Sequence, residues 1–248
     1  MGLNKPLFRK GPLPAGDGVS AHGKSEPITA QTEKGEAIRQ GYVREYKNPG
    51  KGIDNSVSEK ERIRVRNSND VSLQALDAEG FVEKFTGITG NKKVDSAIYN
   101  SATEMLKHRN GTNGEDLHLI DAETGESIHK LTTSKKLNGV LYDEPTLQAI
   151  ETAHAGGREI IAIHNHPNGL PSSVDDGSSA FEHGYIKGIA VGHNLEVWTY
   201  GPTSVRYTPE ECKNIHDAFA EINGFDVDFD EYKWYNMLSE TGMEVHRK

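Results

Sequence analysis

Apolar residues recur along the chain at helical and strand intervals, but only after about residue 58. A helical interval runs from Ser72, the expected N-cap, to Phe85, although Gly80 weakens it, and a second helix is expected over residues 92–107. The remaining predicted helices cover residues 143–153, 176–181, 208–222 and 231–238. Several of these have local start and stop residues, such as Asp143 before the first of them.

Short apolar runs bounded by turn residues predict strands between these helices. The predicted strands cover residues 61–65, 115–121, 127–131, 159–163, 188–191 and 195–200. Two pairs form hairpins, one turning at Glu123-Thr124-Gly125-Glu126 and the other at His193-Asn194. This order of elements predicts an α/β fold in which helices flank a mixed β-sheet.

The pattern divides the chain into four segments. Residues 1–57 are rich in Gly, Pro, Ser, Lys and Glu and are predicted to be a disordered polar tail or linker. Residues 58–109 are expected to form a helical N-terminal extension, residues 110–205 the core, and residues 206–248 C-terminal helices. A chain of 248 residues is long enough for one such core with a tail.

The net charge of -9 is unevenly distributed. Residues 1–70 contain 13 Lys and Arg against 9 Asp and Glu, whereas the rest of the chain contains 15 against 28. The acidic part repels a phosphate backbone, so we expect no nucleic-acid partner for it. The mildly basic tail either contacts nucleic acid or an acidic partner, or serves as a solvated spacer.

Cysteine content and the length of apolar runs indicate the cellular location of the protein. Cys212 is the only cysteine, which excludes an internal disulfide, and no apolar run approaches the roughly 20 residues that cross a bilayer. Residues 1–20 contain no apolar segment typical of a secretory signal. We therefore expect a cytoplasmic protein without a membrane partner, with signal-less export as the alternative.

The predicted strand at residues 159–163 continues into His164-Asn165-His166 and a loop containing proline and glycine. Side chains two apart on a strand point to the same face, so His164 and His166 can converge on one ion while Asn165 faces away. A carboxylate about ten residues later completes the set. Two imidazole nitrogens, one carboxylate and an open fourth position are typical of a catalytic zinc ion.

This pattern resembles the JAMM zinc metallopeptidases, also called MPN-type or JAB-like, over roughly residues 110–202. The shared features are a glutamate that enters a strand, an apolar strand ending in His-x-His-Pro, and Ser-x-x-Asp at the head of a helix. With Ser173 and Asp176 as the last pair, the loop is one residue shorter than in the better-known members. Ser172 with Asp175 is the alternative register.

The resemblance is closest to the JAB-like domains of bacterial polymorphic toxins and phage head-morphogenesis proteins. The shared stretches are Gly-Thr-x-x-Glu-Asp-Leu at residues 111–117, Asp-x-x-Thr-Gly at residues 121–125 and His-Asn-His-Pro at residues 164–167. This resemblance implies an MPN or cytidine-deaminase-like α-β-α fold. It also implies phage or toxin-delivery partner proteins and, as one possible location, the virion.

The same resemblance implies roles for the site residues. His164, His166 and Asp176 would hold Zn²⁺, Glu115 would be the catalytic base, and Ser173 would donate a hydrogen bond to the oxyanion. The expected activity is hydrolysis of a peptide or isopeptide bond in a protein or peptide substrate.

Structural interpretations of the same residues stay open at this point. Glu115 is alternatively a turn residue, and the other candidates for the base are Asp116, Asp121 and Glu123. His118, on the Glu115 strand, and His193, at a turn, are weaker candidates for contact with the site.

Asp176 is alternatively a helix N-cap, Ser173 a loop hydroxyl, and Asp175 a group that orients one imidazole. The competing functions are a metal-dependent nuclease, suggested only by the letters His-Asn-His, and a non-catalytic MPN-like binding module. An intact set of base and ligands argues against the binding module, because binding alone requires no base beside an open metal position.

Overall fold

The computed structural model describes residues 62–64, 70–223 and 228–248, and the predicted tail at residues 1–57 lies outside them. The strands are β1 (Arg62–Arg64), β2 (Leu117–Asp121), β3 (Ser127–Leu131), β4 (Ile160–His166), β5 (Tyr185–Gly192), β6 (Val197–Tyr200), β7 (Asp228–Asp230) and β8 (Val245–Arg247). The α-helices are α2 (Glu79–Glu83), α3 (Lys92–Arg109), α4 (Glu144–Ala155), α5 (Val174–Glu182), α6 (Pro209–Asn223) and α7 (Glu231–Glu240), and η2 (Leu73–Ala75) is a 3-10 helix.

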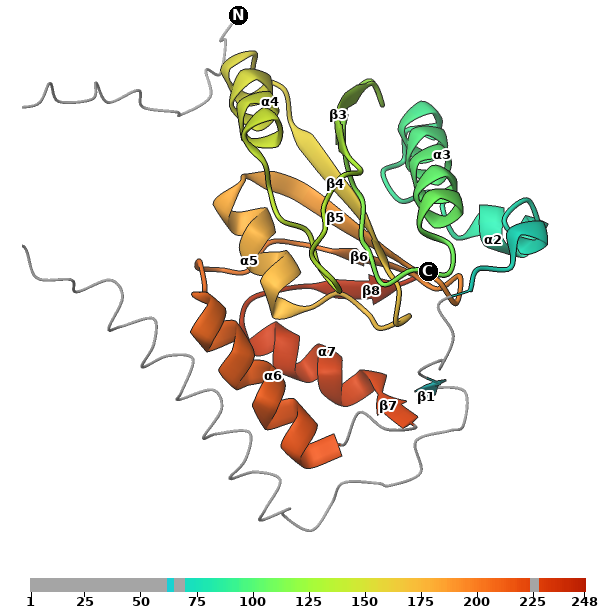
Figure 1. Cartoon of the computed structure of the whole chain (residues 1–248). Helices are drawn as coiled ribbons and strands as arrows, with labels where there is room; N and C mark the ends of the chain where they lie inside the picture. Colours follow the sequence, from blue (N-terminus) through green and yellow to red (C-terminus); the bar gives the residue numbers. More distant parts are fainter. Residues whose placement is uncertain (1–61, 65–69, 224–227) are drawn as a thin grey trace, which may run out of the picture.

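Six of the strands form one mixed sheet in the order β3-β2-β4-β5-β6-β8, and helices flank it on both sides (Figure 1). The chain therefore has the α/β fold that the alternation of patterns predicted. β4 and β5 are parallel, whereas every other neighbouring pair in this sheet is antiparallel. Parallel neighbours need a crossover connection, which α5 supplies, so the end of β4 lies near the start of α5.

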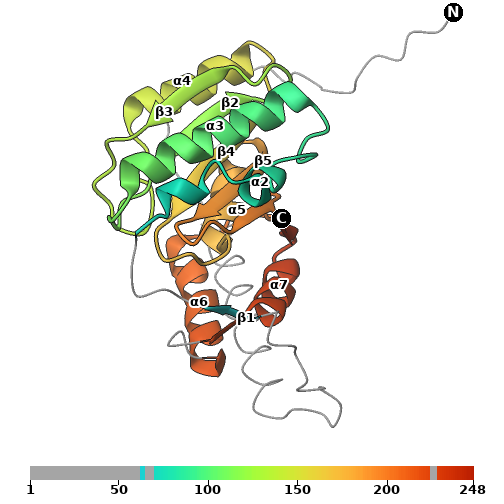
Figure 2. The same cartoon turned by 90° about the vertical axis from the view of Figure 1, so that its right-hand side faces the viewer.

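The sheet separates two apolar cores. On one face, α2 and α3 pack against residues of β4 such as Ile161 and Ile163, and Figure 2 shows α3 lying across the sheet. On the other face, α4 to α7 pack against Ile160, Ala162 and their neighbours. Because side chains alternate along a strand, this pattern sends His164 and His166 to the α5 face and Asn165 to the α3 face.

The single helix predicted from Ser72 to Phe85 is wrong. The chain forms η2 and then α2, and Ala78 between them has an extended backbone, with φ of -70° and ψ of 141°. Ser72 makes no side-chain cap, and Leu73 is 42% exposed, so the assumed apolar stripe is not all buried. Gly80, with its low helix propensity, gave the one sequence indication of this break.

The C-terminal segment contains more than the expected helices. After α7, the short strand β8 pairs with β6 at the edge of the main sheet. The segment around β8 has no apolar alternation long enough to predict a strand. At the other end of the core, α3 forms one of the flanking layers, although its residues lie in the segment expected to be an extension. Within the three described ranges, no helix has the length and apolar character needed to cross a membrane.

Candidate metal centre

Strand pairing brings Glu115 and the two histidines to one place. β2 and β4 are antiparallel with Leu117 opposite His164, and continuing that register by two residues brings Glu115 opposite His166. Glu115, His164 and His166 therefore share the α5 face of the sheet. All three are buried, with exposed fractions of 5%, 2% and 8%.

The three side chains converge closely enough to bind a metal ion. One carboxylate oxygen of Glu115 and one ring nitrogen of each histidine all lie within 4.8 Å of one another. The Nε2 atoms of His164 and His166 are 2.9 Å apart. A buried group of two imidazoles and a carboxylate at this spacing could hold a metal ion.

Asp176 approaches the same point from the first turn of α5. Its Oδ1 lies 3.3 Å from His164 Nε2, and its Oδ2 lies 3.5 Å from His166 Nε2. The interpretation of Asp176 as the N-cap is wrong, because Ser173 occupies that position and Asp176 completes its capping box. The Ser173 backbone N–H and Oγ–H both donate to Asp176 Oδ2, at 2.7 Å and 2.8 Å. Ser173 thus holds the carboxylate against the imidazoles.

Contacts behind each imidazole orient its Nε2 atom toward the cluster. His166 Nδ1 lies 2.8 Å from the Leu170 carbonyl oxygen, which can only accept, so Nδ1 carries the proton and Nε2 of the neutral ring has a lone pair. His164 Nδ1 lies 3.4 Å from the hydroxyl of Tyr200. A backbone carbonyl behind the ring, as at His166, is typical of metal-binding histidines.

Gly188 on β5 makes room for the Tyr200 ring. A Cβ atom at this glycine would lie 1.9 Å from Tyr200 Cζ. The missing side chain therefore allows the tyrosine to lie over the strand and reach His164.

The charges of the cluster shift the pKa values of its members. Burial raises the pKa of Glu115, and the nearby His166 and His164 only partly oppose this. Burial also acts to raise the pKa of Asp176, but contacts with both histidines outweigh it and hold that pKa well below its usual range. For His166, burial acts to lower the pKa, yet the Asp176 contact prevails and raises it to about 9. The cluster therefore favours a carboxylate beside positive charge.

The cluster lies in the wall of a cleft of about 380 Å³. Glu115, both histidines, Asp176 and Ser173 line it, and Tyr142, Tyr185 and Trp234 contribute aromatic surface. Lys136 is the only Lys or Arg among the described residues that line the cleft, and its charge acts to lower the pKa of Glu115. The cleft thus gives an external molecule access to the cluster.

The other carboxylates that the sequence offered as the base lie elsewhere. Asp116 points to the α3 face and pairs with Arg109, Asp121 pairs with Arg158 at the far end of β2, and Glu123 is exposed in the following turn. Of the candidates, only Glu115 joins the histidines.

The alternative register is also placed away from the imidazoles. Asp175 lies 3.6 Å from His216 on α6 and does not orient His164 or His166. Ser172 is buried, its hydroxyl has no hydrogen-bond partner in the described part of the chain, and its carbonyl accepts from Trp234 Nε1.

Two further histidines lie near the site without joining it. His118 is buried on the α3 face, where neither ring nitrogen has a partner among the described residues. The His193 ring lies 3.0 Å from the Asn165 side chain, and its backbone N–H donates to the His166 carbonyl, so its ring is not part of the cluster. Asn165 and Tyr200 support the site, and the sequence did not predict this role for either residue. For Asn165, the strand alternation gave its direction but not its partner.

The donor set could hold a metal ion. Two imidazole nitrogens and one carboxylate are ligands that catalytic zinc uses, and the lone cysteine, Cys212, is buried and contributes its thiol to none of these contacts. No protein-family model, curated protein or solved structure that was compared with the chain matches it. The motif and this geometry are therefore the basis for the function of the chain.

Proposed function

We propose that this protein is a zinc-dependent metallopeptidase or isopeptidase of the JAMM type, acting on a protein or peptide substrate. The observation that carries the proposal is the convergence of Glu115, His164 and His166, buried together in the wall of a cleft, with Asp176 against both rings. Titratable groups held together in this way are typical of catalytic sites.

In this proposal, His164, His166 and Asp176 hold the zinc ion. A bound zinc ion with an open position lowers the pKa of water to about 7 and polarises a carbonyl group. The Leu170 carbonyl and the Tyr200 hydroxyl keep both Nε2 atoms directed into the cluster, where the ion would bind, and Ser173 keeps Asp176 in place.

Glu115 serves as the general base and acid. Its carboxylate accepts a proton from the attacking water and passes it to the nitrogen of the departing amine. The raised pKa of Glu115 favours the first of these transfers, because a carboxylate with a higher pKa is a stronger base and accepts a proton more readily than an ordinary carboxylate. The pKa of Glu115 is raised, whereas the pKa of Asp176 is depressed. This difference gives the two carboxylates different roles.

Ser173 has two roles in the proposal. Its hydroxyl now donates to Asp176 Oδ2, so a hydrogen bond from Ser173 to the oxyanion requires that hydrogen bond to be exchanged for one to the substrate. Until then, Ser173 positions the Asp176 carboxylate.

The nuclease alternative derives no support from the letters His-Asn-His. Asn165 points to the opposite face of the sheet from the histidines, and its amide is hydrogen-bonded to main-chain groups there. The phage or toxin setting, and the partner proteins that it implies, depend on the sequence resemblance alone.

The ligand and base assignments are tested by metal content. Wild-type protein should contain one zinc per chain, His164→Ala should lose it, and Glu115→Gln should keep it. Asp175→Asn is the matched control, because Asp175 contacts His216 rather than the ring pair. Retention of zinc by His164→Ala would contradict the ligand assignment.

The activity is tested by incubating zinc-loaded wild type and Glu115→Gln with a cell extract and identifying new protein N-termini and lost isopeptide conjugates by mass spectrometry. Cleavage products that appear with wild type and are absent with Glu115→Gln support the proposal. Equal cleavage by both proteins would sink it, as would magnesium-supported cleavage of DNA by His166→Ala.

A further inference from the structure

Asn165 stands between the two proposed ligands but faces the other side of the sheet. It is completely buried on the α3 face, close to the main chain around Glu115. A buried amide with three hydrogen-bonding partners needs a reason for being there, because unsatisfied amides are costly in that environment.

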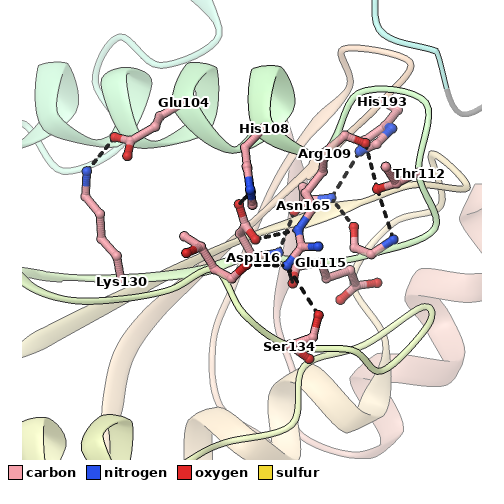
Figure 3. Close-up of polar contacts among 12 residues, drawn as sticks. Glu104, His108, Arg109, Thr112, Glu115, Asp116, Lys130, Ser134, Asn165 and His193 are labelled. Carbon is pink, nitrogen blue, oxygen red and sulfur yellow. Dashed lines mark hydrogen bonds and ion pairs between the residues drawn. The ribbon is translucent and has the colours of Figure 1, made fainter.

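The Asn165 amide holds the peptide groups on both sides of Glu115. Its Oδ1 accepts from the Asp116 backbone N–H at 2.8 Å, and its Nδ2 donates to the Gly114 carbonyl at 3.1 Å (Figure 3). The two ends of the amide cannot be exchanged, because an N–H only donates and a carbonyl oxygen only accepts. Asn165 therefore pairs with Gly114 and Asp116 in a single orientation.

The second hydrogen of Nδ2 points to His193. The distance from Nδ2 to His193 Nε2 is 3.0 Å, so this ring nitrogen accepts the hydrogen bond. The His193 backbone N–H in turn donates to the His166 carbonyl at 3.0 Å. Through His193, the Asn165 amide is thus also linked to the main chain of His166, one of the two histidines of the cluster.

Arg109 holds the same stretch of main chain from the end of α3. Its Nε donates to Asp116 Oδ1 at 2.5 Å, and its Nη2 donates to the Glu115 carbonyl at 3.3 Å. His108 Nδ1 lies 2.7 Å from Asp116 Oδ2. Figure 3 shows these groups gathered on one side of the Glu115 segment, with the Glu115 side chain directed away from them. The main chain of Glu115 is therefore fixed by contacts that leave its carboxylate free.

We propose that Asn165 is a positioning residue that sets the Glu115 carboxylate relative to His164 and His166, a role that depends on the proposed function. Because Asn165 lies in the same strand as the ligands, one amide fixes the distance between base and metal site. A misplacement of about 1 Å costs on the order of 100-fold in rate at such sites. Asn165 does not contact the cluster itself, so its loss should leave metal binding unchanged.

The test compares Asn165→Leu with Ile163→Ala, a truncation in the same strand that packs on the α3 core and leaves the amide contacts intact. With a substrate identified for the wild type, kcat of Asn165→Leu should fall about 10- to 100-fold, with KM and one zinc per chain retained. In a Glu115→Gln background, the same change should alter the residual rate less than about 3-fold, because no base remains to be placed. An equal loss in both backgrounds means a structural role and overturns the inference.

Amide hydrogen exchange followed by NMR gives a readout that needs no substrate. The Asp116 amide should exchange faster in Asn165→Leu, whereas in Ile163→Ala it should keep its protection relative to neighbouring β2 amides. Asn165→Ala, which removes the amide without adding bulk, replaces the leucine variant if that variant does not fold. Unchanged Asp116 protection in a folded variant overturns the inference, and so does full kcat.

The two proposals fail in different ways. If wild type and Glu115→Gln cleave the same bonds, or neither cleaves any, the proposed function fails and the role of Asn165 fails with it. If only wild type is active and the Asn165 variants match its kcat, the function stands and this inference alone is wrong.

Discussion

The two faces of the sheet at the end of β4 contain similar residue types in opposite arrangements. On the α3 face, the carboxylate of Asp116 is paired with the guanidinium of Arg109 and the ring of His108. On the α5 face, two carboxylates and two imidazoles converge beside a cleft. Lys136 is the one Lys or Arg among the described residues that line this cleft. We call the α3 face the closed face and the α5 face the open face.

Burial alone therefore does not distinguish a functional carboxylate from a structural one. Glu115 and Asp116 are consecutive, and both are almost completely buried. Asp116 is compensated by protein groups, as buried charges in stable folds are. Glu115 is held beside titratable groups in a place that an external molecule can reach, which is the arrangement expected where chemistry occurs.

The largest expected effect tests the closed face. Asp116→Ala should lower the free energy of unfolding by about 3–5 kcal/mol, because the largely covered Arg109 guanidinium would lose its carboxylate partner. Chemical denaturation measures this. Glu104→Ala, which breaks an exposed pair between α3 and Lys130 of β3, should cost less than about 0.5 kcal/mol. Equal losses in the two variants would contradict the contrast between the faces.

His118 is the exception on the closed face, because neither ring nitrogen is paired among the described residues. Burial lowers its pKa to about 4, whereas the unfolded chain titrates near 6.5. Between these values the unfolded state binds the extra proton, so the contribution of His118 to stability is present above pH 6.5 and is lost as the pH falls to about 4.

His118→Leu should therefore flatten the dependence of the unfolding free energy on pH in that range, by about 2–3 kcal/mol relative to wild type. Denaturation at several pH values, with a chelator present throughout, provides the measurement. Parallel curves for variant and wild type would show that His118 is not held neutral by burial.

The open face is disturbed from a distance by Gly188→Ala. The added Cβ would displace Tyr200, which should cost about 1–3 kcal/mol and weaken zinc binding about 10- to 100-fold through His164. Competition with a chelator of known affinity measures the binding. Gly80→Ala is the matched control, since no atom lies within 4 Å of its Cβ, and it should stabilise the protein slightly. Unchanged zinc affinity in Gly188→Ala would show that Tyr200 does not support metal binding.

The smallest effect concerns Glu115 itself in metal-free protein. Glu115→Gln should leave the free energy of unfolding within about 1 kcal/mol of wild type or raise it, because a buried carboxylate near Asp176 is replaced by a neutral amide. Asp116→Asn makes the same chemical change one residue later and should cost clearly more. Similar costs at both positions would break the comparison of the two faces.

Local chemistry explains what the sequence predicted well. The strand predicted at residues 127–131 matches β3, and Asp143 begins α4 by accepting from the Thr146 backbone N–H, a contact within one helical turn. The convergence of His164 and His166 also depends only on the alternation along one strand. In each of these cases, neighbouring residues supply the whole interaction.

Contacts between distant segments explain what the sequence could not predict. The partner of Asn165 depends on the register of β2 against β4, and the role of Tyr200 depends on the missing side chain of Gly188. The edge strand β8 is defined by pairing with β6 and has almost no pattern of its own. The break at Ala78 lies between Leu76 and Phe81, and both of these side chains pack in the core that contains α3.

The link between α7 and the loop before α5 has a practical consequence. Trp234 Nε1 donates to the Ser172 carbonyl at 2.8 Å, next to the serine that caps the helix bearing Asp176. A fragment trimmed to residues 110–205 would look complete by motif, yet it would lack this tether, the α3 layer and the strand that covers β6. Inactivity of such a fragment would reflect the loss of these supporting contacts. It would not test the chemistry of the intact chain.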